Sequence, residues 1–233
     1  MGRARRSTWW ENDINGRAVS ISILLRPRSG FTKRLFDRIE PNRDCGAWID
    51  GPFGPSSVNW NLNSKVGDYG HAFFIATGIG IAAQLPYIKE LLDGHEKAQI
   101  CTRRISLVWQ LDRIGDYESA RDLLQFLVRQ DNGYMLHVSI YDPLRAQSED
   151  DIQHIGENGL IDVHSGRAIW EKQLDIEIES QMGKMLVLVC AQAQTRHDIR
   201  NLVRSHVNKN VELFEPEFQP WGQTGSLRAF LKP

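Results

Sequence analysis

Four apolar segments after residue 70 limit the fold of the chain more than any other feature of the sequence. Each is apolar almost throughout, and stretches of helical periodicity separate them. The segments span residues 71–77, 104–111, 134–141 and 185–191, and the helical patterns lie near residues 80–92, 116–130, 166–181 and 195–208. Strands buried on both faces and separated by helices are typical of a parallel sheet with crossover connections. The pattern predicts a doubly wound α/β domain, which a further strand near residues 210–216 closes.

The first part of the chain lacks this alternation of apolar strands and helices. Alternating residues over 18–27 predict a strand, and residues 31–39 form a short amphipathic helical pattern. Residues 46–70 hold one short strand and then a stretch rich in Gly, Pro, Ser and Asn, which favours a loop. We therefore expect a β-rich part over residues 1–67 and the α/β domain over residues 68–233. Residues 142–159 are polar, and we expect them to form a flexible excursion.

Composition narrows the class of protein. The net charge of -1 shows no basic surplus for nucleic acid, so the basic start MGRARR is interpreted as a solvated tail. No apolar run reaches the roughly 18 residues of a membrane span, and three widely spaced cysteines indicate reduced thiols. The seven histidines show no metal-binding spacing, so no protein-bound metal is expected. Taken as written, the chain is expected to be cytoplasmic.

A pair of glycines follows the first strand of the α/β domain. The segment ATGIGIAA, residues 76–83, joins the strand to a helix, and glycines there would let a pyrophosphate approach the backbone at the helix N-terminus. The other interpretation is a glycine-rich turn without a ligand, since Ala83 stands where the dinucleotide fingerprint has its third glycine. Pro86 should either kink the helix or delay its start.

Several motifs, taken in order, carry a resemblance to a known family. They are RPRSGFTKRL, DGPFGPS, FFIATGIGIAAQLPYIKELL, ISLVWQLD, DLLQFLVRQD, VLVCA and FEPEFQPW, and they cover about residues 9–221. Together they resemble the cytosolic dehydrogenase portion of fungal ferric-chelate reductases, which are relatives of NADPH oxidases and, more distantly, of ferredoxin–NADP reductases. In that family a flavin-binding barrel precedes a nicotinamide-binding domain. The resemblance implies electron transfer from NAD(P)H to FAD, then to haems in a membrane domain, and finally to ferric iron.

The resemblance assigns roles to residues in both parts of the chain. Gly30, Phe31 and Thr32 match a flavin motif, although without the resemblance an ordinary helix cap at Thr32 would be favoured. Gly51, Pro52 and Gly54 match a motif beside the nicotinamide nucleotide, or else form only a tight turn. The remaining matches are the pyrophosphate loop Thr77, Gly78, Ile79 and Gly80, the ring-side cysteine Cys190, and the flavin-covering aromatics Phe218 and Trp221. Without the resemblance, Cys190 could equally be a core thiol, and the two aromatics could be surface-packed residues.

The choice between NADH and NADPH depends on the end of the second strand of the α/β domain, where Trp109, Asp112 and Arg113 lie. Asp112 could accept hydrogen bonds from ribose hydroxyls, which favours NADH. Arg113, or the earlier Arg103 and Arg104, could pair with a 2′-phosphate. The resemblance favours NADPH. Each of these charges could also simply be a solvated strand end.

The sequence departs from the family at its start. The His-Pro-Phe-Thr-like flavin motif is replaced by MGRARR, and the barrel strands and haem-bearing helices before it are missing. We therefore expect a partial flavin barrel, with haem confined to a missing membrane portion. The leading hypothesis is a ferric reductase-type oxidoreductase domain with a membrane reductase as partner. The alternatives are a superoxide-generating NADPH oxidase domain and a non-catalytic nucleotide-binding remnant.

Overall fold

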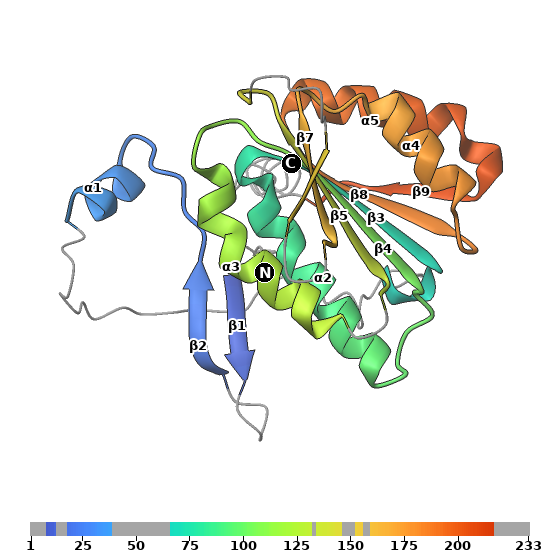
Figure 1. Cartoon of the computed structure of the whole chain (residues 1–233), viewed down its shortest axis with the longest axis horizontal. Coiled ribbons are helices and arrows are strands. Elements are labelled where there is room, and N and C mark those ends of the chain that lie inside the picture. Colours follow the sequence, from blue (N-terminus) through green and yellow to red (C-terminus); the bar gives the residue numbers. More distant parts are fainter. Residues whose placement is uncertain are drawn as a thin grey trace, which may run out of the picture.

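The computed structural model of the chain describes residues 8–12, 18–38, 66–131, 134–145, 152–155 and 159–216. Within these ranges a seven-stranded sheet forms the centre of the molecule, with strand order β6-β7-β5-β4-β3-β8-β9 (Figure 1). Its strands are β3 (His71–Thr77), β4 (Arg104–Gln110), β5 (Leu136–Asp142), β6 (Ile152–Ile155), β7 (Ile161–Ser165), β8 (Met185–Cys190) and β9 (Val211–Phe214). All pairings are parallel except the antiparallel pair of β6 with β7.

The strand order reverses at β3, because β4 lies on one side of it and β8, which comes much later in the chain, lies on the other. In an open parallel sheet such a reversal opens a crevice beyond the carboxyl ends of the strands. The predicted doubly wound sheet is confirmed, and the crevice belongs at the ends of β3 and β8.

Helices cover both faces of the sheet. The α-helices of this domain are α2 (Ile81–Glu96), α3 (Asp116–Gln130), α4 (Trp170–Glu179) and α5 (Ala193–Ser205), with the short 3-10 turns η1 (Val66–Asp68), η2 (Gly78–Gly80) and η3 (Val207–Lys209). Alternate residues of β3 enter different cores: Phe74 packs with α2 and α3, whereas Phe73 packs with α4 and α5. This period of two explains why β3 is apolar on both faces.

The amino-terminal part contributes a two-stranded antiparallel sheet of β1 (Thr8–Asn12) and β2 (Ala18–Ile23), followed by helix α1 (Phe31–Arg38). Strand β1 contacts helix α2, and in Figure 1 α1 extends away from the central sheet. Val19, Ile21 and Ile23 are exposed on β2, and α1 has no buried residue. The partial flavin barrel stays a prediction, as does the proposed domain boundary.

One expectation about the middle of the chain is wrong, and a second is confirmed with narrower bounds. Residues 142–159 do not form only a flexible excursion, because β6 lies within this range and pairs at the edge of the sheet. The helical pattern expected from residue 166 begins at Trp170, and β7 precedes it. Both strands are short, and β6 is largely exposed with polar residues between its isoleucines. Such an edge strand shows little of the apolar signal of a buried strand.

Helix α2 runs through Pro86, which lies within the helix at its sixth residue, so the proline does not delay its start. Two residues before the proline, the fully buried Gln84 turns back toward the sheet. Its Nε2 donates hydrogen bonds to the backbone carbonyls of Ile75 in β3 and Leu188 in β8, both at 3.1 Å. One side chain therefore ties the helix to the two strands on either side of the crevice.

A buried polar cluster lies at the opposite, amino ends of the strands. Glu177 of α4 accepts hydrogen bonds from Ser106 Oγ at 2.7 Å and from Arg104 Nε at 3.0 Å. His71 Nε2 lies 3.1 Å from the same carboxylate oxygen. Burial alone would raise the pKa of Glu177, but hydrogen bonds from the three surrounding side chains outweigh it and lower the pKa to about 2. The cluster fastens α4 to the sheet.

No helix within the described ranges is both long and apolar enough to cross a bilayer.

Candidate functional site

The turn from β3 into α2 forms the floor of the candidate site. Thr77 ends the strand in an extended conformation, and Gly78 then takes a positive φ of 48°, which favours glycine. Three residues, Gly78–Gly80, form a 3-10 turn before α2 begins at Ile81. The positive φ at Gly78 turns the backbone from strand to helix, and the turn itself is buried beneath neighbouring side chains.

The two glycines have different surroundings. A Cβ on Gly78 would lie 2.0 Å from Asp112 Oδ2 and 2.6 Å from Arg26 Nη2, so two movable side chains occupy that space. A Cβ on Gly80 would lie 1.9 Å from the backbone oxygen of Cys190. Gly80 therefore permits close packing of α2 against the end of β8, which is a different role from the access to a pyrophosphate expected from the sequence.

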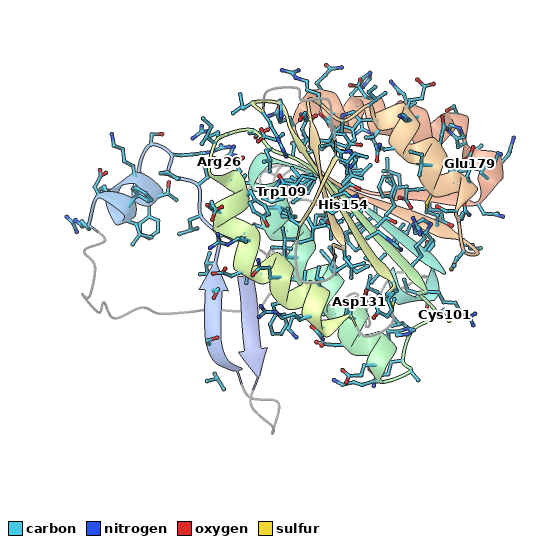
Figure 2. All side chains as sticks on the ribbon, in the orientation of Figure 1. Arg26, Cys101, Trp109, Asp131, His154 and Glu179 are labelled. Carbon is cyan, nitrogen blue, oxygen red and sulfur yellow. The ribbon has the colours of Figure 1, made fainter. Side chains whose placement is uncertain are left out.

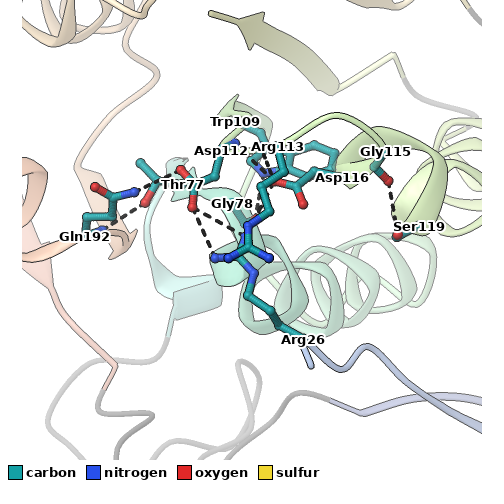
Figure 3. Close-up of polar contacts among 10 residues, drawn as sticks. All are labelled: Arg26, Thr77, Gly78, Trp109, Asp112, Arg113, Gly115, Asp116, Ser119 and Gln192. Carbon is teal, nitrogen blue, oxygen red and sulfur yellow. Dashed lines mark hydrogen bonds and ion pairs between the residues drawn. The ribbon is translucent and has the colours of Figure 1, made fainter. Parts of the chain in front are cut away.

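Trp109 of β4 fixes the backbone of the turn through a hydrogen bond. Its side chain is fully buried in β4, and its Nε1 donates a 2.9 Å hydrogen bond to the carbonyl of Gly78 (Figure 3). A buried indole N–H needs an acceptor, and here the acceptor is the first residue of the turn. Trp109 was expected to contact the cofactor, but it is enclosed in the core and acts on the site through the backbone.

Polar side chains connect the carboxyl ends of the three central strands. Asp112, just after β4, accepts a hydrogen bond from Gln192 Nε2 at 3.0 Å and pairs with Arg26 Nη1 at 3.3 Å. Gln192, just after β8, also donates its backbone N–H to Thr77 Oγ1 at 2.8 Å. Figure 3 shows this network surrounding Gly78. The site thus combines the backbone of a glycine turn with a carboxylate, an amide and a guanidinium that lie over it.

Two arginines predicted as partners of a 2′-phosphate lie at the wrong end of the sheet. Arg104 begins β4 and bonds to Glu177, and Arg103 directly precedes it. Since parallel strands run in one direction, both lie a full strand length from the crevice. Arg113 follows Asp112 at the carboxyl end of β4 and is exposed. Of the three, only Arg113 lies at the correct edge.

The flavin-motif residues are not brought to this crevice. Gly30 has a φ of 88° and precedes α1, where Phe31 is 70% exposed. Thr32 Oγ1 accepts the backbone N–H of Arg28 at 2.9 Å, a contact that organises the turn before the helix. Figure 1 shows α1 well away from α2 and the strand ends. Five further predicted site residues lie outside the described residues, namely Gly51, Pro52, Gly54, Phe218 and Trp221.

Cys190 ends β8 beside Gly80, where a Cβ on that glycine would lie 3.4 Å from its sulfur. Burial raises the pKa of the Cys190 thiol to about 12, although the nearby Arg196 guanidinium opposes the shift. The group is therefore a neutral thiol at physiological pH. A small uncharged sulfur suits a site beside an aromatic ring better than a thiolate would.

Thiol labelling should separate the two described cysteines. At pH 7.5 we expect iodoacetamide to label Cys101, which is exposed at the opposite end of the sheet (Figure 2), while Cys190 remains largely unmodified. The thiolate is the reacting form, and a raised pKa leaves little of it at Cys190. Peptide mass spectrometry over time gives both rates. Equal rates at the two positions would contradict this description of Cys190.

Three residues of the site were not predicted from the sequence: Arg26, Asp116 and Gln192. Asp116 begins α3, and its carboxylate accepts the backbone N–H groups of Asp112 and Arg113 at 3.0 and 3.1 Å, fixing the loop after β4. Among the described residues, no group of three or more His, Cys, Asp or Glu side chains could hold a metal ion. The charged groups at the crevice, Arg26, Asp112 and Asp116, thus contact one another and the backbone of the loop after β4.

Comparison with known proteins places this fold in a family. The model of the ferric reductase NAD binding domain family matches residues 69–204, more than half of the chain. The chain belongs to the ferric reductase NAD-binding domain family. The matched range contains the turn from β3 into α2, Asp112 and Cys190, so the site lies inside the family's domain. This confirms the family that the motif series resembles, and with it an NAD(P)-binding, oxidoreductase-type domain.

One curated protein is similar to the chain in sequence, and one solved structure is similar to it in fold. This chain is 27% identical over 104 residues to "Ferric reduction oxidase 8, mitochondrial" of Arabidopsis thaliana. This match covers 42% of the chain and 13% of that relative's length. The fold resembles the cytochrome b5 reductase domain of Ulva prolifera nitrate reductase, with a TM-score of 0.53 at 13% identity over 91% of this chain and 85% of that one. At this identity the likeness concerns the fold alone.

Proposed function

We propose that this chain is the nicotinamide-nucleotide-binding part of a ferric-chelate reductase. In this proposal it binds NAD(P)H over the turn from β3 into α2, on the cytosolic side of a membrane. Electrons then pass to FAD, to haem in a membrane partner and to ferric iron as substrate. The observation that carries the proposal is the match to the ferric reductase NAD-binding family across the glycine turn at the point where the strand order reverses.

The residues at the crevice fit a dinucleotide. Gly78 presents backbone without a Cβ, Arg26 supplies positive charge beside it, and Thr77 and Gln192 hold the ends of β3 and β8 together. When bound, NAD(P)H would supply a hydride, and the residues of the chain would orient the ligand and shield it from water. Cys190, as a neutral thiol at the end of β8, would offer a small polarizable surface to the nicotinamide ring.

NADPH is the nucleotide that we propose. Asp112 Oδ1 already accepts a hydrogen bond from Gln192 Nε2, which reduces the capacity of this carboxylate for ribose hydroxyls. Arg113 is exposed at the same strand end and can reach a 2′-phosphate from solvent. This division of the two charges favours a phosphorylated ribose over a free one.

Nucleotide titration followed by flavin reduction tests the proposal. Calorimetry should detect NADPH binding to the purified chain, with NADH binding more weakly. The chain is then incubated with FAD under anaerobic conditions, and NADPH should bleach the flavin absorbance and reduce a ferric chelate. No heat at millimolar NADPH would disprove the proposed function. Nucleotide binding without flavin bleaching would instead support a non-catalytic nucleotide-binding remnant.

A further inference from the structure

Arg26 brings a charge from outside the α/β domain onto the turn. It follows β2 in the sequence, yet its Nη2 lies 2.6 Å from the position that a Cβ on Gly78 would occupy. Figure 3 shows the guanidinium pointing at the turn beside Asp112 and Asp116. The side chain is 16% exposed, so a ligand in the crevice could reach it. The backbone on which we propose that the diphosphate rests therefore has an arginine directly against it.

The existing ion pairs of Arg26 are long. Its Nη1 lies 3.3 Å from Asp112 Oδ2, and its Nη2 lies 3.5 Å from Asp116 Oδ2. Charge-assisted hydrogen bonds between such groups usually measure about 2.7–2.9 Å. Arginine offers five N–H donors in a planar fork, and these contacts use only the two terminal nitrogens. The guanidinium is thus held near the turn and retains donor capacity for an incoming anion.

Two carboxylates lie near the turn, and a cation is needed to offset their repulsion of a diphosphate. Asp112 and Asp116 face the crevice from the loop after β4 and would repel a diphosphate. The positive charges at this edge include Arg26, the exposed Arg113 farther along the loop, and Arg196 near Cys190 at the end of β8. Without Arg26, an anion approaching Gly78 would meet two carboxylates at close range. The favourable effect of the helix N-terminus would then be opposed by local repulsion.

We infer that Arg26 is the residue that recognises the diphosphate of the nucleotide. Its guanidinium exchanges the long contacts with Asp112 and Asp116 for direct hydrogen bonds to phosphate oxygens. The planar fork of arginine matches two such oxygens at once, whereas a lysine would act only as a point charge. This inference rests on the proposed function and adds to it a binding residue supplied by the amino-terminal part of the chain.

ADP binding to variants of the whole chain tests the inference, because ADP carries the diphosphate without the nicotinamide. Arg26→Ala should weaken ADP binding about tenfold or more, as expected for loss of a charged hydrogen bond. Arg28→Ala, a change of the exposed arginine two residues later, should leave ADP binding unchanged. Adenosine, which lacks phosphate, should bind both variants like the wild type. Circular dichroism verifies that each variant is folded.

A double variant separates direct contact from simple neutralisation of Asp112. If Arg26 contacts the phosphates, Arg26→Ala combined with Asp112→Asn should still bind ADP clearly more weakly than Asp112→Asn alone. Equal affinities of these two proteins would overturn the inference. So would tighter ADP binding by Arg26→Ala, which would mean that the arginine obstructs the turn. Failure of the wild type to bind ADP and NADPH would instead count against the proposed function itself.

Discussion

Gly80→Ala is expected to lower the free energy of unfolding by about 3 kcal/mol, at the upper end of the cost of an overpacked core. The new Cβ would lie 1.9 Å from the backbone oxygen of Cys190, and backbone cannot rotate away as a side chain can. Either α2 or the end of β8 must therefore shift. Since these two elements border the crevice, nucleotide affinity should fall together with stability. Urea unfolding measures the first effect and calorimetric titration the second.

Gly115→Ala provides the control for this substitution. Gly115 has a φ of 87°, but a Cβ there would meet nothing within 4 Å. It should carry only the cost of a left-handed backbone, about 1–2 kcal/mol, with no loss of nucleotide binding. If Gly80→Ala proved no more destabilising than Gly115→Ala, the close packing of α2 against β8 would be disproved.

Glu177→Gln is expected to destabilise the protein by about 3 kcal/mol at pH 7, because it removes the charge from a buried carboxylate that three side chains surround. The folded-state pKa of Glu177 is depressed from 4.5 to about 2. Its contribution to stability is therefore present above pH 4.5 and is lost as the pH falls toward 2. The wild type and the variant should thus differ most at neutral pH and converge in acid.

Thermal or urea unfolding between pH 7 and pH 3 measures this difference. The matched control is Glu179→Gln, two residues later in α4, where the side chain is exposed on the outside of the molecule (Figure 2). Its effect should stay within about 0.5 kcal/mol at every pH. A difference between the wild type and Glu177→Gln that did not shrink in acid would show that lost packing, and not the charge, causes the destabilisation.

Much of the α/β domain could be predicted from the sequence because its central strands are buried on both faces. The strand expected at residues 71–77 is β3, and the one expected at 185–191 is β8, one residue shorter. Hydrophobic burial on both faces leaves a continuous apolar run, which is the strongest local signal a strand can have. The edge strand β6 lacks that signal, since its pairing comes from backbone hydrogen bonds that place little demand on residue type.

The candidate site likewise has a part that could be predicted from the sequence and a part that could not. Thr77, Gly78 and Gly80 follow one another in a local motif, so their position at the strand end could be predicted. The contact of Arg26 with Asp112 joins residues 86 positions apart, and Gln192 reaches the same carboxylate from 80 positions away. Nothing in the local pattern around any of these residues records its partner. The arrangement of charges over the turn is therefore a consequence of tertiary structure.

The hydrogen bonds of Gln84 have a consequence for how a ligand would enter. The pairing of β3 with β8 already sets the separation of the two strands, and this amide fixes the start of α2 against them before any ligand arrives. The floor of the crevice is thus preorganised, and binding need not order the backbone there. The side chains around the turn, Arg26, Asp112 and Gln192, are then the groups that would adapt to different nucleotides. Changes in selectivity can then evolve at these side chains without altering the scaffold.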